Sequence, residues 1–106
     1  MTDRRAIAVQ QRRGVALPPH TRSVARPSRF GNPFRCASDP ASRAAAVAQY
    51  REWLDGHHPD VLGPAGGLTG PMVKDLARRE LAGWDLACYC PLDGPCHRLV
   101  LLELCT

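Results

Sequence analysis

The alternation of apolar and polar positions predicts three short strands in this chain. Residues 6–9 form an apolar run, residues 23–25 form a weaker one, and residues 84–90 alternate with the two-residue period of a strand. Too few residues separate the first two strands for a helical crossover, so we expect them to pair antiparallel.

Helical spacing of apolar residues predicts three helices. Asp39-Pro40 is typical of a helix start, an N-cap followed by proline, and the helix it begins should end at Gly56. A second helix is predicted from Pro71 to Gly83, and a third from Pro95 onward. The third helix is apolar nearly all round, which indicates deep packing.

These elements together predict an α/β fold over residues 1–106 as a single domain. We expect a three-layer-like or two-layer Rossmann-like arrangement, with a two- to three-stranded mixed sheet and about three helices. The second and third strands are joined through two helices, so they should run parallel and end at one edge of the sheet. Ligands bind outside that edge in open α/β sheets. The loop 26–34 should therefore lie beside the turn 90–97.

Composition indicates the cellular compartment of the protein more clearly than it indicates a function. A formal net charge of +4 over 106 residues is compatible with an anionic ligand or with nucleic acid, but it is too small to decide between them. The sequence has neither an apolar run long enough for a membrane helix nor the apolar core of a signal peptide. Five unevenly spaced cysteines fit a reduced, cytoplasmic protein without a membrane partner better than a disulfide scaffold.

The stretch from Asp85 to Arg98 carries most of the candidate chemistry, because it holds three of the five cysteines and one of the four histidines. Cys90 should face a pocket at the strand end. Cys96 should lie in the first turn of the last helix, where the helix N-terminus favours a thiolate. His97 should project roughly 100° away from Cys96 around that helix, so the two side chains need not share a pocket.

The loop 26–34 supplies candidate ligand-binding residues. Arg26 and Arg29 offer planar guanidinium groups that can hold a phosphate or a carboxylate. Asn32 either orients a substrate through its amide or only shapes the Gly-Asn-Pro turn. Phe34 is one of two aromatic residues that should line a pocket or fold back onto the core.

Three stretches of the chain together resemble a known family. They are Arg26-Pro-Ser-Arg-Phe-Gly-Asn-Pro-Phe34, Tyr50-Arg-Glu-Trp-Leu54, and Asp85-Leu-Ala-Cys-Tyr-Cys-Pro91 with Pro95-Cys-His97. They resemble a small domain family seen in phage and bacterial genomes, the domain-of-unknown-function family forty-three twenty-six. Phe30 and Tyr89 stand where tryptophan is expected in much of that family. The resemblance implies that the Gly-Asn-Pro-Phe loop and the Cys-x-Cys and Cys-His motifs belong to one site, and it supplies no established activity.

The first functional hypothesis is a cysteine-centred site for an anionic, nucleotide-like small molecule. Cys90 or Cys96 would be the nucleophile of a cysteine-dependent transferase or hydrolase, with His97 as general acid or base. Asn32 and Arg29 would position the ligand.

Two alternatives remain open from the sequence. Cys88, Cys90, Cys96 and His97 could form a zinc-stabilised Cys3His module, although Cys-x-Cys is tighter than the usual zinc knuckle and adjacent Cys-His ligands strain a tetrahedron. A nucleic-acid-associated accessory protein could use the basic N-terminal part, but no nucleic-acid-binding motif is present. Substrate, reaction, pathway and oligomeric state stay undetermined.

Overall fold

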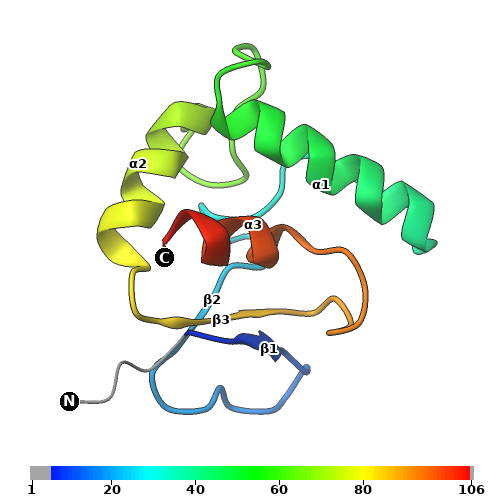
Figure 1. The fold of residues 1–106 in the computed structure, drawn as a ribbon, viewed down its shortest axis with the longest axis vertical. Coiled ribbons are helices and arrows are strands. Elements are labelled where there is room, and N and C mark those ends of the chain that lie inside the picture. Colours follow the sequence, from blue (N-terminus) through cyan, green and yellow to red (C-terminus); the bar gives the residue numbers. More distant parts are fainter. Residues whose placement is uncertain (1–5, 106) are drawn as a thin grey trace.

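The computed structural model describes residues 6–105 and contains six regular elements (Figure 1). In chain order they are β1 (Ala8–Gln10), β2 (Thr21–Ser23), α1 (Pro40–Leu54), α2 (Gly70–Glu80), β3 (Asp85–Cys88) and α3 (His97–Leu104). Three helices and an open three-stranded sheet confirm the predicted α/β class.

The sheet is entirely parallel, with the strand order β1-β3-β2. Ala8 of β1 and Arg22 of β2 both lie opposite Leu86 of β3. The prediction of a mixed sheet with an antiparallel β1–β2 pair is therefore wrong. It assumed that strands adjacent in sequence are neighbours in the sheet, whereas β3 lies between them and the loop 11–20 connects the two edges. The predicted parallel pairing of β2 with β3 is confirmed.

All three helices lie on the same side of the sheet (Figure 1). Helix α3 contacts β1 and β3, and α1 and α2 pack against α3 and against each other. Among residues 6–105, no helix has the length and apolar character needed to cross a membrane.

The starts of α1 and α2 follow from local chemistry. Asp39 caps α1, because its carboxylate accepts hydrogen bonds from the Ser42 amide at 2.9 Å and the Ser42 hydroxyl at 2.8 Å. At the start of α2, a Cβ atom on Gly70 would lie 1.7 Å from the carbonyl oxygen of Trp53. Only glycine therefore allows α2 to begin so close to the end of α1.

Helix α3 begins two residues later than predicted. Cys96 is its N-cap, with an extended backbone at φ −156° and ψ 143°, and His97 is its first residue. Pro95 belongs to the connection before the helix and not to its first turn. The prediction of deep packing is confirmed for Leu101, which is fully buried, but Leu99 is 41% exposed, so the helix keeps one open face.

The core joins the helices to the two long loops. The buried Tyr50 hydroxyl donates to the Phe30 carbonyl at 2.8 Å, and Trp53 Nε1 donates to the Val61 carbonyl at 2.7 Å. Since both donors belong to α1, this helix fixes the loop 26–34 on one side and the loop that leads into α2 on the other. The first of these loops is thereby held at the edge of the sheet where β2 and β3 end.

Candidate functional site

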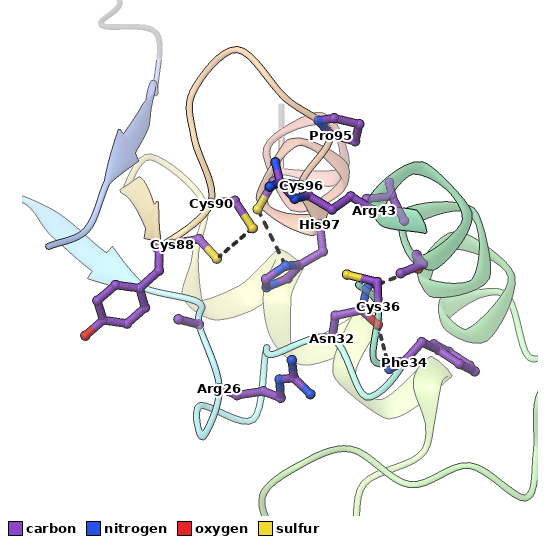
Figure 2. A pocket seen from close by; sticks show the side chains of 14 residues that line it. Arg26, Asn32, Phe34, Cys36, Arg43, Cys88, Cys90, Pro95, Cys96 and His97 are labelled. Carbon is purple, nitrogen blue, oxygen red and sulfur yellow. Dashed lines mark hydrogen bonds between the residues drawn. The ribbon is translucent and has the colours of Figure 1, made fainter. Parts of the chain in front are cut away.

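A cleft of about 280 Å³ lies at the carboxyl ends of β2 and β3 (Figure 2). Its lining residues come from the loop after β2, from α1, and from the segment between β3 and α3. They are Ala25, Arg26, Asn32, Phe34, Cys36, Arg43, Ala46, Val47, Cys88, Tyr89, Cys90, Pro95, Cys96 and His97. The predicted neighbourhood of the 26–34 loop and the 90–97 turn is confirmed by this list.

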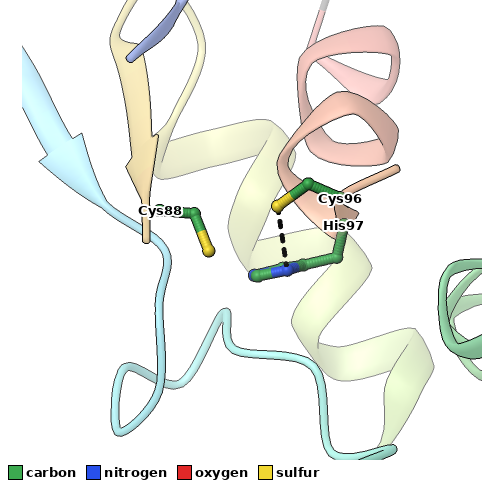
Figure 3. A group of neighbouring side chains, drawn as sticks. All are labelled: Cys88, Cys96 and His97. Carbon is green, nitrogen blue, oxygen red and sulfur yellow. Dashed lines mark hydrogen bonds between the residues drawn. The ribbon is translucent and has the colours of Figure 1, made fainter. Parts of the chain in front are cut away.

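Three thiols and one imidazole gather in the wall of this cleft, and we refer to Cys88, Cys90, Cys96 and His97 as the Cys/His cluster. The Sγ atoms of Cys88 and Cys90 are 3.9 Å apart, and Cys96 Sγ lies 3.7 Å from His97 Nδ1. The ligand atoms that Cys88, Cys96 and His97 could offer to a metal ion all lie within 4.8 Å of one another (Figure 3). The cluster thus unites residues from the end of β3 and the start of α3.

The expectation that Cys96 and His97 diverge by a helical step is wrong. Cys96 precedes the helix and has an extended backbone, so the 100° rotation between successive helical residues does not apply to this pair. Both side chains instead point toward Cys88 (Figure 3). Cys96 and His97 are also buried, with 2% and 6% of their surface exposed.

The His97 ring is held in one orientation by its other nitrogen. Nε2 lies 2.6 Å from the Val24 carbonyl oxygen, which can only accept, so Nε2 is the donor. Burial lowers the pKa of His97 and keeps the ring neutral at pH 7. In the neutral ring Nδ1 then carries the lone pair, and this atom faces the Cys96 thiol.

The cluster distributes charge unequally among its thiols. Hydrogen bonds from the Cys90 and Cys96 thiols lower the pKa of Cys88, and the nearby Arg98 charge acts in the same direction. The pKa of Cys96 is raised, because its thiol interacts with Cys88 and Cys90 and because it is buried. These pKa directions favour Cys88 as the thiolate of the cluster, in place of the Cys96 expected from the helix N-terminus; a Cys96 thiolate stays a prediction.

Arg98 is a functional candidate that the sequence analysis missed. Its side chain is 1% exposed and donates four hydrogen bonds of 3.0 Å to the carbonyls of Val9, Cys88, Cys90 and Pro91. None of the ion pairs within residues 6–105 involves it. The signal in the sequence was a lone charge directly after Cys-His at the start of an apolar helix.

Three of the candidate ligand-binding residues of the 26–34 loop line the cleft, and one of these three also makes hydrogen bonds that shape the loop. Arg26 and Phe34 line the cleft. Asn32 also lines it, but its amide nitrogen donates to the Ala46 carbonyl at 3.1 Å and its amide oxygen accepts from the Phe34 amide at 2.9 Å. These bonds favour the loop-shaping alternative for Asn32.

Arg29 does not line the cleft. Its guanidinium is bonded to Glu80 of α2 and lies 5.3 Å from the centre of the Phe30 ring. Arg43 of α1 occupies the position in the cleft that Arg29 was expected to share with Arg26. No local pattern indicated Arg43, because the packing of α1 against the 26–34 loop brings it there.

The fold and the site define a small α/β domain with an open parallel sheet and a Cys/His cluster at the carboxyl edge of that sheet. Residues 7–106 match the family described as Domain of unknown function (DUF4326), so the chain belongs to this family. No curated protein and no solved structure matches the chain.

Proposed function

We propose that this domain binds an anionic, nucleotide-like small molecule in the cleft at the carboxyl edge of the sheet. The observation that carries the proposal is the charge of the cleft. Among the described residues, Arg26 and Arg43 line it, and no aspartate or glutamate does. An anion would meet two guanidinium groups in a lining that has no carboxylate of its own.

Arg26 and Arg43 differ from the neighbouring arginines in ion pairing, although the Arg43 charge lies near enough to Asp39 to help lower the pKa of that carboxyl. Neither Arg26 nor Arg43 takes part in an ion pair within the part of the chain that the structure describes. Arg22 and Arg29, by contrast, are both paired with Glu80. A ligand phosphate would therefore gain two charge-assisted contacts without breaking an existing one.

The rest of the cleft favours a ligand with a flat apolar part. Phe34, Val47 and Pro95 contribute apolar surface to its lining. Aromatic rings in such a wall stack against a base or another planar group. The cleft volume of about 280 Å³ is close to the lower end of the range for small-molecule sites.

A cysteine-dependent transferase or hydrolase is the second candidate. Cys90 is half-buried and lines the cleft, so it is the thiol of the cluster that a ligand could reach most easily. Cys96, with 2% of its surface exposed and a raised pKa, is a poor nucleophile in this arrangement. A general acid or base role for His97 belongs to this second candidate.

Isothermal titration with adenosine monophosphate, inorganic phosphate and adenosine would test the proposal. We expect adenosine monophosphate to bind most tightly, and added salt to weaken it. Arg26→Gln and Arg43→Gln should each weaken binding at least tenfold, since each removes about 1.5–3 kcal/mol of charged hydrogen bonding.

Arg79→Gln is the matched control for this experiment. Arg79 is exposed on α2, is bonded only to Asp75, and does not line the cleft, so its loss should leave binding unchanged. The proposal fails if phosphate-bearing probes do not bind at millimolar concentration, or if binding survives both cleft substitutions. Covalent labelling of Cys90 by a substrate-like electrophile, blocked by adenosine monophosphate, would support the second candidate.

A further inference from the structure

We propose that Cys88, Cys90, Cys96 and His97 form a tetrahedral zinc site between the end of β3 and the start of α3. The zinc site goes beyond the binding of an anion in the cleft. It rests on the geometry of the cluster and on the neighbouring Arg98 charge, so it holds or fails independently of the ligand.

Two distances within the cluster match edges of a zinc tetrahedron. Zinc binds sulfur at about 2.3 Å and imidazole nitrogen at about 2.0–2.1 Å, which places two sulfurs about 3.8 Å apart and sulfur and nitrogen about 3.6 Å apart. The Cys88–Cys90 sulfur distance is 3.9 Å, and the distance from Cys96 Sγ to His97 Nδ1 is 3.7 Å. Two opposite edges of the tetrahedron thus already have the required length.

The backbone conformation accounts for the two unusual spacings among these ligands, the tight Cys-x-Cys pair and the adjacent Cys-His pair. Cys88 is the last residue of β3 and the chain bends at Tyr89 and Cys90, and this bend leaves the two Sγ atoms 3.9 Å apart while Tyr89 is exposed. The extended backbone of Cys96 turns its thiol toward the His97 ring (Figure 3). Neither pair of ligands needs the longer spacing of a zinc knuckle.

His97 is prepared as a ligand by its hydrogen bond to the Val24 carbonyl. With the proton on Nε2, the Nδ1 lone pair is directed at the cluster. Metal-binding histidines almost always donate their second ring nitrogen to a carbonyl or carboxylate in this way. The bond fixes both the tautomer and the plane of the ring before a metal arrives.

Charge balance points in the same direction. A zinc ion with three thiolates and a neutral histidine has a net charge of −1. The buried Arg98 guanidinium lies next to it, donating to the carbonyls of Cys88 and Cys90, and it has no ion-pair partner within residues 6–105. An uncompensated buried charge is costly, and the zinc–thiolate centre would compensate it.

Metal loading of the full chain under reducing conditions tests the site. We expect one zinc per chain by elemental analysis, and a cobalt-loaded protein with the visible spectrum of tetrahedral Co²⁺ and charge-transfer absorption from three thiolates. Cys88→Ser, Cys90→Ser and Cys96→Ser should each weaken zinc at least tenfold in competition with a chelating dye. Cys36→Ser, which changes an exposed cysteine in the cleft lining outside the cluster, should retain wild-type affinity.

A second measurement keeps the test valid if the variants fail to fold. In the wild-type protein, zinc should protect Cys88, Cys90 and Cys96 from alkylation, and a chelator should expose these three together, as read by peptide mass spectrometry. Failure to bind zinc, a cobalt spectrum with fewer than three thiolates, or protection that a reductant but not a chelator removes would overturn the site. Adenosine monophosphate titrations of chelator-treated protein separate this failure from failure of the anion proposal.

Discussion

Removing the Arg98 side chain is expected to be the most destabilising polar substitution in the described part of the chain. Its four donated hydrogen bonds connect β1, the end of β3 and the segment after it, through the carbonyls of Val9, Cys88, Cys90 and Pro91. Hydrogen bonds to charged groups contribute roughly 1.5–3 kcal/mol each. The cost of removing the guanidinium from water offsets several kcal/mol of the stabilisation that the four hydrogen bonds provide together.

Arg98→Met should therefore lower the free energy of unfolding by about 3–5 kcal/mol, because buried carbonyls lose their donor. A domain of this size is stabilised by only about 5–15 kcal/mol in total. Arg98→Lys should lose less, since an ammonium group supplies three donors but not the planar fork. Urea denaturation followed by the fluorescence of Trp53, which is buried, and Trp84 would measure these changes, with chelator and reductant present so that metal binding does not contribute.

Arg79→Met provides the control for that experiment, because Arg79 is exposed and bonded only to Asp75. Its effect should stay within about 0.5 kcal/mol. If Arg98→Met changes the unfolding free energy by less than about 1 kcal/mol, the reasoning from buried carbonyls is refuted.

Three further predictions concern packing, mobility and pH. Leu101→Ala should cost about 2–5 kcal/mol because Leu101 is fully buried, whereas Leu99→Ala on the open face should cost far less; equal shifts in denaturation midpoint would contradict this. In hydrogen exchange, the loop 57–70 should be the least protected segment, and helix-like protection there would be contrary evidence. Hydrogen bonds from Ser42 hold the pKa of Asp39 below its ordinary value, so its capping contribution is present above the unfolded pKa and is lost as pH falls through the folded pKa. The difference in melting temperature between wild type and Asp39→Ala should accordingly shrink below about pH 4, and a constant difference would argue against the titration.

The sequence by itself determined the features that depend on neighbouring residues. Asp39-Pro40 placed the start of α1, because capping involves only residues within one helical turn. The alternation from Leu86 to Cys88 predicted a strand there, and β3 ends at Cys88; the 3.9 Å approach of the Cys88 and Cys90 sulfurs is made by the bend after the strand. The helical crossover from β2 to β3 determined that these strands run parallel, and so which edge of the sheet carries the cleft.

Only the tertiary structure decided which distant residues meet. The position of β3 between β1 and β2 depends on pairing across more than sixty residues, which no local pattern encodes. Arg29 does not line the cleft, because it pairs with Glu80, which is 51 residues away in the sequence. Arg43 does line the cleft, because α1 packs beside the loop 26–34.

The same distinction applies to the Cys/His cluster. The sequence supplied its four side chains, but the convergence of Cys96 and His97 requires an extended residue before α3, held among Cys88, the Val24 carbonyl and the Arg98 bonds. Residue types and local conformations follow from short-range sterics and hydrogen bonding. The partners of a buried thiol, imidazole or guanidinium follow from the packing that removes them from water, and that packing exists only in the folded chain.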